Sequence, residues 1–127
     1  MKNIYASGEE YLKWILKLQT QMGKVRSIDL AEKMGFSRPS ICKAVKRLED
    51  NEFIIKDKDG VLNFTEKGQK VAEQFYERHY FLTEFLTSIG VCRETAVADA
   101  CKIEHAISDE TFTSLKSKYP NLLKQDD

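Results

Sequence analysis

The strongest limit on the fold of this 127-residue chain comes from residues 27–64. Residues 27–34 and residues 38–51 each repeat apolar side chains at helical intervals, and Gly35 separates the two runs. Ser37 is a favourable N-cap for the second run, because its hydroxyl can accept a hydrogen bond from a main-chain N–H in the first turn. The pattern therefore predicts two short helices joined by a tight turn.

A β-hairpin is predicted directly after these helices. Residues 53–56 and 61–64 are rich in β-favouring side chains, and the polar turn between them ends in Asp59-Gly60. Two short helices followed by a hairpin predict a winged helix-turn-helix. In that motif the second helix enters the major groove of DNA.

Polar and basic side chains occupy the outer face of the second predicted helix. We expect Arg38, Ser40 and Lys43 to lie nearest the base edges, and the hairpin lysines to contact phosphates. The alternative is an ordinary solvated face. Residues 1–60 carry 12 basic and 9 acidic side chains, whereas the whole chain carries 20 of each, so the N-terminal part is the one that could face phosphate. The candidate DNA contacts are Ser37, Arg38, Pro39, Ser40, Lys43, Lys46, Arg47, Lys56 and Lys58.

The segment from Asp99 to His105 contains a thiol, a carboxylate and an imidazole. Cys101, Glu104 and His105 stand at i, i+3 and i+4, which are neighbouring positions on a helix. These donors suit a first-row divalent metal better than calcium or magnesium, and another segment must fill the open coordination positions. The alternative is a buried thiol beside a solvated glutamate and histidine. His79, on an earlier helical run, either joins these ligands or packs among aromatic side chains.

Helical periodicity recurs outside the winged helix and predicts a mainly α chain. We expect residues 1–70 to form a winged helix-turn-helix DNA-binding domain and residues 71–127 a helical metal-binding and dimerisation domain. The last two helices are too short to bury their apolar faces alone, so a homodimer is expected. The further predicted helices cover about residues 8–22, 66–88, 93–107 and 109–119.

Assembled in order, these motifs resemble the iron- and manganese-dependent repressor family, which includes the diphtheria toxin repressor and the manganese transport regulator. The resemblance covers nearly everything from Ser7 to Tyr119, and the chain's short length is similar to the manganese-type architecture. The segments that carry it are Glu9-Glu10-Tyr11-Leu12, Arg38-Pro39-Ser40, Leu62 to Gly68, Arg78-His79, and Asp99 to His105 with Ser108-Asp109-Glu110.

The resemblance also implies a set of metal ligands and a function. It implies one principal site made of Glu10, Cys101, Glu104 and His105, with His79 assisting. Lys13 stands where the manganese branch has a ligating glutamate, and a protonated lysine cannot bind a metal. The implied function is a repressor of metal-uptake genes that binds operator DNA with iron(II) or manganese(II); zinc(II) and cobalt(II) are also possible.

The cysteines and the hydropathy of the sequence indicate the cellular compartment of the protein. The three cysteines form no Cys-x-x-Cys pair, which predicts a reduced, cytoplasmic protein without disulfides. No apolar run approaches the roughly 20 residues that span a bilayer, so we expect no membrane partner.

Two other functions stay open beside metal-dependent regulation. One is a winged-helix regulator that has lost metal control, in which Lys13 pairs with Glu10 and Cys101 packs or acts as a redox thiol. The other is a small metal-dependent hydrolase that uses Glu104 as its base, since an open metal position can activate water. The sequence contains no separate catalytic constellation, and we expect the protein not to be an enzyme.

Overall fold

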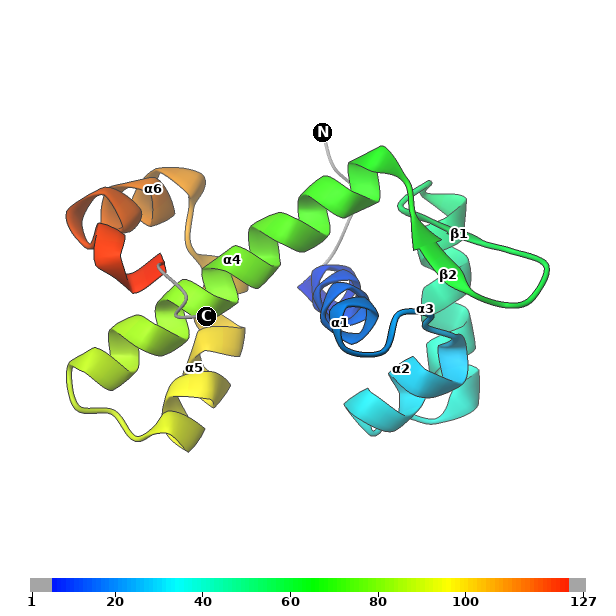
Figure 1. The fold of residues 1–127 in the computed structure, drawn as a ribbon, viewed down its shortest axis with the longest axis horizontal. Helices are drawn as coiled ribbons and strands as arrows, with labels where there is room; N and C mark the ends of the chain where they lie inside the picture. Colours follow the sequence, from blue (N-terminus) through cyan, green and yellow to red (C-terminus); the bar gives the residue numbers. More distant parts are fainter. Residues whose placement is uncertain (1–5, 124–127) are drawn as a thin grey trace. The chain divides into compact units, whose positions relative to one another are not determined.

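The computed structural model describes residues 6–123, with side chains from Gly8 onward (Figure 1). The chain divides into two compact units between Gln74 and Phe75, so that one long helix begins in the first unit and ends in the second. The elements in order are α1 (Ala6–Met22), α2 (Ser27–Met34), α3 (Arg38–Asp50), β1 (Ile54–Lys56), β2 (Leu62–Phe64), α4 (Glu66–Ser88), α5 (Arg93–Ala106), α6 (Asp109–Lys118) and the 3₁₀ turn η1 (Pro120–Leu123).

Local signals set the helix-turn-helix of the first unit. Gly35 adopts φ 70° and ψ 26° at the end of α2, a left-handed conformation that costs glycine little. The Ser37 hydroxyl then accepts a hydrogen bond from the Ser40 N–H and caps α3, with Pro39 in the first turn. The predicted start of α3 is therefore confirmed.

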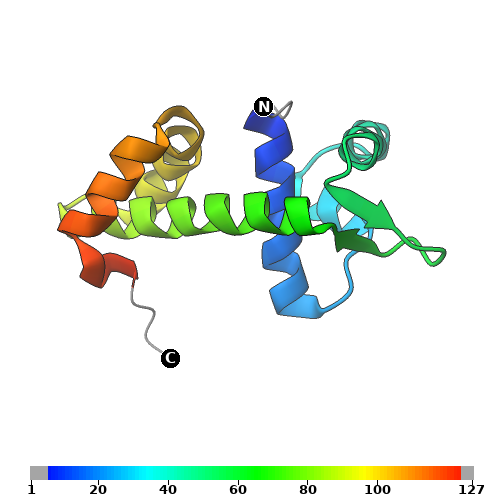
Figure 2. The same ribbon diagram turned by 90° about the horizontal axis from the view of Figure 1, so that it is seen from above.

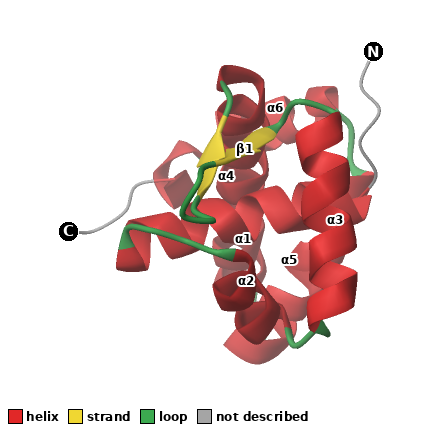
Figure 3. Ribbon diagram, turned by 90° about the vertical axis from the view of Figure 1, so that its right-hand side faces the viewer, coloured by secondary structure: helices red, strands yellow, loops and turns green. Residues whose placement is uncertain are grey.

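The wing is a two-stranded antiparallel hairpin, drawn as arrows in Figure 2 and in yellow in Figure 3. Ile54 pairs with Phe64, and Lys56 pairs with Leu62. The Asp57 carboxylate accepts hydrogen bonds from the main-chain N–H groups of Asp59 and Val61, which closes the predicted turn. The prediction of a mainly α chain with a winged helix-turn-helix is confirmed.

A continuous apolar core joins the helices and the hairpin of the first unit. Its members come from every element of that unit, because each helix has one apolar stripe and the first residue of each strand points inward. The most deeply buried members are Leu12, Ile15, Val25, Leu30, Ile41, Val45, Leu62 and Ala72.

The second unit contains the C-terminal part of α4 with α5, α6 and η1. Phe81 and Phe112 meet edge to face with ring centroids 5.6 Å apart, and both side chains are buried. Ala96 and Ala100 are completely buried on α5. Ala100 packs in one apolar cluster with Phe81 and Leu82 of α4 and Phe112 of α6, and the polar side chains at the end of α5 lie within reach of α4.

The predicted boundaries need small corrections. Helix α1 begins at Ala6, two residues before the predicted start, and each strand has three residues. The Ser108 hydroxyl accepts a hydrogen bond from the Thr111 N–H, as expected for the cap of α6. The turn η1 was not predicted, because Pro120 indicates a helix end, yet proline also suits the first position of a new turn. Among residues 6–123, no helix is both long enough and apolar enough to cross a membrane.

Candidate metal centre

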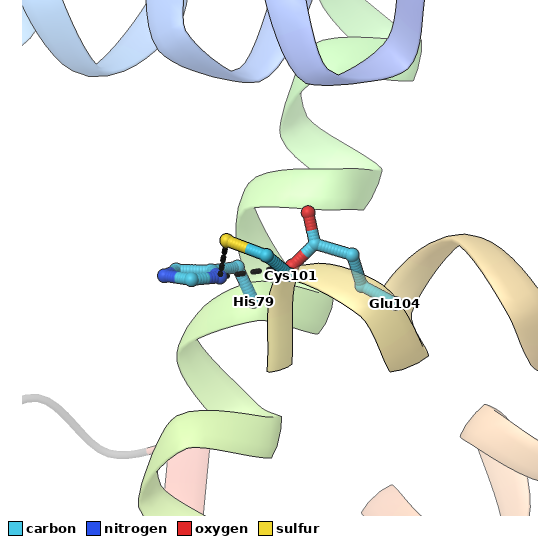
Figure 4. Close-up of side chains that lie close together, drawn as sticks. All are labelled: His79, Cys101 and Glu104. Carbon is cyan, nitrogen blue, oxygen red and sulfur yellow. Dashed lines mark hydrogen bonds and ion pairs between the residues drawn. The ribbon is translucent and has the colours of Figure 1, made fainter. Parts of the chain in front are cut away.

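Helices α4 and α5 bring His79, Cys101 and Glu104 together in the second unit (Figure 4). His79 Nδ1 lies 2.9 Å from Glu104 Oε1 and 3.8 Å from Cys101 Sγ. All three candidate ligand atoms lie within 4.8 Å of one another. Ligands of a transition metal stand about 2.0–2.3 Å from the ion, so neighbouring ligand atoms stand roughly 3–4 Å apart. The three side chains fit such an ion with small adjustments.

Glu104 is the centre of this cluster and is completely buried. A buried carboxylate is costly unless its oxygens have partners. Oε1 faces His79 Nδ1, and Oε2 lies 3.3 Å from His105 Nε2. Glu104 thus has an imidazole at each oxygen, one from α4 and one from its own helix.

His105 is held by an aromatic contact in addition to Glu104. Its ring stacks on Phe75 of α4, with centroids 5.2 Å apart and an interplanar angle of 28°. The predicted trio of α5 is therefore divided: Cys101 and Glu104 meet His79, whereas His105 lies at the other oxygen of Glu104.

Glu10 belongs to the first unit, and both of its carboxylate oxygens have partners within α1. Oε1 lies 3.1 Å from Lys13 Nζ, and Oε2 accepts a 2.8 Å hydrogen bond from Trp14 Nε1. The Lys13 side chain is only 1% exposed. The role of Glu10 as a metal ligand stays a prediction, and Lys13 holds its carboxylate as an ion pair.

The nine candidate DNA contacts are all exposed. Four of those on α3 line a shallow groove of about 420 Å³ together with Cys42 and Asp50, which sequence reasoning did not propose; the four are Pro39, Lys43, Lys46 and Arg47. The signal for Cys42 was available, since position 42 falls outside the apolar stripe of α3. Ser37 already uses its hydroxyl as the cap of α3, and Lys46 Nζ lies 3.4 Å from the Asp50 carboxylate.

Comparison with known proteins accounts for both units. Residues 3–62 match the family model of the iron-dependent repressor N-terminal DNA-binding domain, and residues 65–124 match that of the iron-dependent repressor metal-binding and dimerisation domain. The chain belongs to the iron-dependent repressor family. This confirms the resemblance seen in the sequence.

Individual members of the family show how far the similarity extends. The transcriptional regulator MntR of Salmonella typhimurium is 35% identical over 104 residues, which cover 82% of this chain and 66% of that protein. The structure of the manganese regulator SloR is 31% identical with a TM-score of 0.79, over 91% of this chain and 54% of that one. The structure of a manganese-dependent transcriptional repressor in complex with manganese is 26% identical with a TM-score of 0.82, over 94% of this chain and 55% of that one. The chain thus spans just under two thirds of that MntR and about half of the two solved structures.

Proposed function

We propose that this protein is a metal-dependent, DNA-binding transcriptional regulator that represses metal-uptake genes. The observation that carries the proposal is the meeting of His79, Cys101 and Glu104 in the unit whose family model describes metal binding. In this proposal a divalent metal binds the unit and favours the arrangement of the two subunits, within an existing dimer, that fits an operator. A regulator that binds operator DNA works in the cytoplasm, which is the localisation we propose.

The two halves of the chain have separate tasks in this proposal. Residues 1–70 bind double-stranded DNA through α3 and the wing, and residues 71–127 bind the metal and a second copy of the chain. The exposed positions of Arg38, Lys43 and Lys56 support the first task. Phosphate contacts position the protein, whereas side chains in the major groove select the sequence.

The donor set indicates which metals fit. A thiol, an imidazole and a carboxylate favour iron(II), zinc(II) and cobalt(II). Manganese(II) is supported instead by the similarity to solved structures of manganese regulators. Cys101 must lose its proton and His79 must be neutral to bind a metal, so affinity increases as the pH is raised. The Glu104 carboxylate lies between His79 and His105 and needs little movement to exchange a hydrogen bond for a metal. When bound, the metal supplies a positive charge that draws these three donors together.

For metal binding to raise operator affinity, the metal must make a contact that exists only in the arrangement of the protein that binds DNA. A metal shifts an equilibrium by its differential affinity for the two states, and about 1.4 kcal/mol gives each tenfold gain in operator affinity. We propose that Glu10 supplies this contact from α1, completing the ligand set with Cys101, Glu104 and His105, with His79 assisting. The metal would then connect α1, in the helix-turn-helix unit, to α5.

The test is operator affinity with and without metal. DNA selected from a random-sequence pool by the manganese-loaded protein serves as the operator, and binding is measured anaerobically with iron(II) and with manganese(II). We expect Cys101→Ala, Glu104→Ala and His105→Ala to abolish the gain from metal while weak binding to random DNA remains. Glu94→Ala, which removes an exposed carboxylate from the same helix, is the matched control and should retain the gain.

A regulator without metal control is the second candidate, and the Lys13–Glu10 ion pair favours it. It predicts equal operator affinity with and without metal in the wild-type protein. We propose no catalytic activity, because the two family models describe DNA binding, metal binding and dimerisation. A metal-dependent turnover of ester or phosphoester substrates would contradict this.

A further inference from the structure

Arg78 is a buried arginine that the metal site as described so far does not use. Its side chain is 4% exposed and lies on α4 next to His79. Nη1 donates hydrogen bonds to the main-chain carbonyls of Glu104, at 2.9 Å, and Ile107, at 3.0 Å. Nη2 donates to the carboxylate of Asp109 in the first turn of α6. One guanidinium therefore joins three helices of the second unit.

The Glu104 carbonyl lies in the last turn of α5, which finishes at Ala106, and the Ile107 carbonyl is that of the C-cap residue. The last carbonyls of a helix have no partner within the helix, and a positive charge there is favourable. Arg78 satisfies two of them. Glu104 and His105 both lie in this last turn, where a helix without such a partner frays.

Consecutive residues of α4 hold Glu104 at two points. Arg78 bonds its main-chain carbonyl, and the His79 ring bonds its carboxylate. One turn earlier, the Phe75 ring contacts both groups: the Arg78 guanidinium lies 5.1 Å from its centroid, and the His105 ring stacks on it. The positions i, i+3 and i+4 of α4 thus form one face that holds both C-terminal candidate ligands of α5.

We propose that Arg78 is a positioning residue of the metal centre, and this proposal rests on the proposed function. Arg78 fixes the main chain at Glu104, so that the carboxylate is already directed toward His79 and Cys101 before a metal arrives. Ligands held in advance bind more tightly and with a defined geometry. The arm to Asp109 has a lesser role, because the Asp109 side chain is 80% exposed and exposed ion pairs contribute little.

The experiment compares Arg78→Met, Arg78→Lys, Asp109→Asn and Arg93→Met. Arg93 is the matched control: it is exposed on α5 and pairs with Glu84, whose carboxylate lies 3.0 Å away. Cobalt(II) is the probe, because its absorption spectrum reports both coordination geometry and bonding to the Cys101 thiolate. Affinity comes from anaerobic cobalt titration against a competing chelator, and far-UV circular dichroism with thermal unfolding reports the metal-free fold.

We expect Arg78→Met to weaken cobalt binding by about 10–100-fold, the range typical of lost outer-shell partners, and to change the bound-cobalt spectrum. Arg78→Lys keeps the positive charge but cannot form the same fork of hydrogen bonds, so it should give an intermediate affinity with a changed spectrum. Asp109→Asn and Arg93→Met should keep the wild-type spectrum. If Arg78→Met does not fold, the affinity and the spectrum of Arg78→Lys test the proposal.

Several results would overturn the proposal while leaving the proposed function intact. A wild-type spectrum and affinity in a folded Arg78 variant would show that Arg78 is structural only. The same conclusion follows if the variants lose thermal stability but bind cobalt normally once folded. If the wild-type protein itself binds no cobalt, iron(II) or manganese(II), the proposed function fails instead.

Discussion

At the scale of single residues, burial decides what each polar group of the candidate metal centre can do. Glu104 has no exposed surface, and its two oxygens face the imidazoles of His79 and His105. In water, the interaction between a carboxylate and an imidazole is weak, but it strengthens when solvent is excluded. Burial of Glu104 therefore strengthens its interactions with the two imidazoles and keeps these candidate ligand atoms close together.

The Glu10–Lys13–Trp14 cluster gives a prediction for metal preference. Lys13→Glu replaces the cation beside Glu10 by a carboxylate and should raise manganese(II) affinity or stoichiometry, because oxygen ligands suit manganese. Trp14 is the only tryptophan, and its indole N–H donates to Glu10, so its fluorescence should report a metal that reaches Glu10. Lys17→Glu, which changes another lysine near the Trp14 ring, is the control. An unchanged manganese titration for Lys13→Glu would place Lys13 away from the site.

Cys92 gives a prediction of pH-dependent reactivity. It is an exposed cysteine at the N-cap of α5, and its Sγ lies 3.3 Å from Thr95 Oγ1. Hydrogen bonding with Thr95, through its side chain first and then its main chain, lowers the pKa of the Cys92 thiol. A lowered pKa gives more thiolate at a given pH, so alkylation of Cys92 should begin at lower pH than for an ordinary thiol. Thr95→Val should move the pH–rate profile of Cys92 upward. Peptide mapping separates Cys92 from Cys42, whose rate should not change, and an unmoved Cys92 profile would contradict the assignment.

At the scale of elements, the junction of the wing with α4 leaves no space for a side chain. Thr65 Oγ1 accepts a hydrogen bond from the Gly68 N–H, and the Thr65 N–H donates to the Phe53 carbonyl. A Cβ on Gly68 would lie 1.8 Å from the Phe53 carbonyl oxygen. The first turn of α4 is therefore packed directly on the main chain that leads into β1.

Gly68→Ala should destabilise the first unit, because a main-chain atom cannot move aside as a flexible side chain can. Overpacking of this kind costs about 1–3 kcal/mol, and the short contact indicates the upper end of that range or more. Chemical denaturation measures the loss. Lys70→Ala, at an exposed position of the same helix, should change stability little. A Gly68→Ala protein as stable as the wild type would mean that the wing moves freely relative to α4.

The helix-turn-helix and the wing should differ in how they bind DNA. Lys56 on β1 is exposed, and replacing it by alanine should weaken binding to all sequences alike and lower the salt slope by about one unit. Lys46→Ala should act in the same way. Arg38→Ala should instead cost about 1–3 kcal/mol on the operator and relax one position of the selected sequence. Equal losses on operator and random DNA would assign Arg38 to a phosphate.

At the scale of the whole molecule, two units have separate cores, and α4 continues from one into the other. Among the residues that the structure describes, the apolar cluster of the second unit is small: it contains four buried residues with partly buried neighbours. Ile89 and Tyr119 of that unit are 63% and 43% exposed. Such a unit gains stability when a second copy covers apolar surface.

We expect a dimer in the absence of both metal and DNA. Sedimentation equilibrium at micromolar concentration should give twice the chain mass, because association depends on apolar burial and not on the metal ligands. Cys101→Ala is the control and should also be dimeric. A mass near the 14.7 kDa of one chain would contradict the expectation.

Much of the fold could be predicted because its signals are local. Gly35, Ser37 and Ser108 act within one or two turns of their own positions, so helix ends and the helix-turn-helix follow from neighbouring residues alone. The hairpin turn at Asp57 is equally local. The spacing of Cys101 and Glu104 on one helix is a matter of helical geometry.

Tertiary packing decided which side chains face Glu104, because contacts between helices depend on residues far apart in the chain. His79 is 25 residues from Glu104, and only the packing of α4 on α5 brings its ring to the carboxylate. The same packing turns His105 toward Phe75 and the second oxygen, and places Arg78 at the end of α5. Periodicity shows that Ala96, Ala100 and Glu104 share a face of α5, but it does not show which other helix that face meets. Packing of that face against α4 then brings the Glu104 carboxylate to the His79 ring.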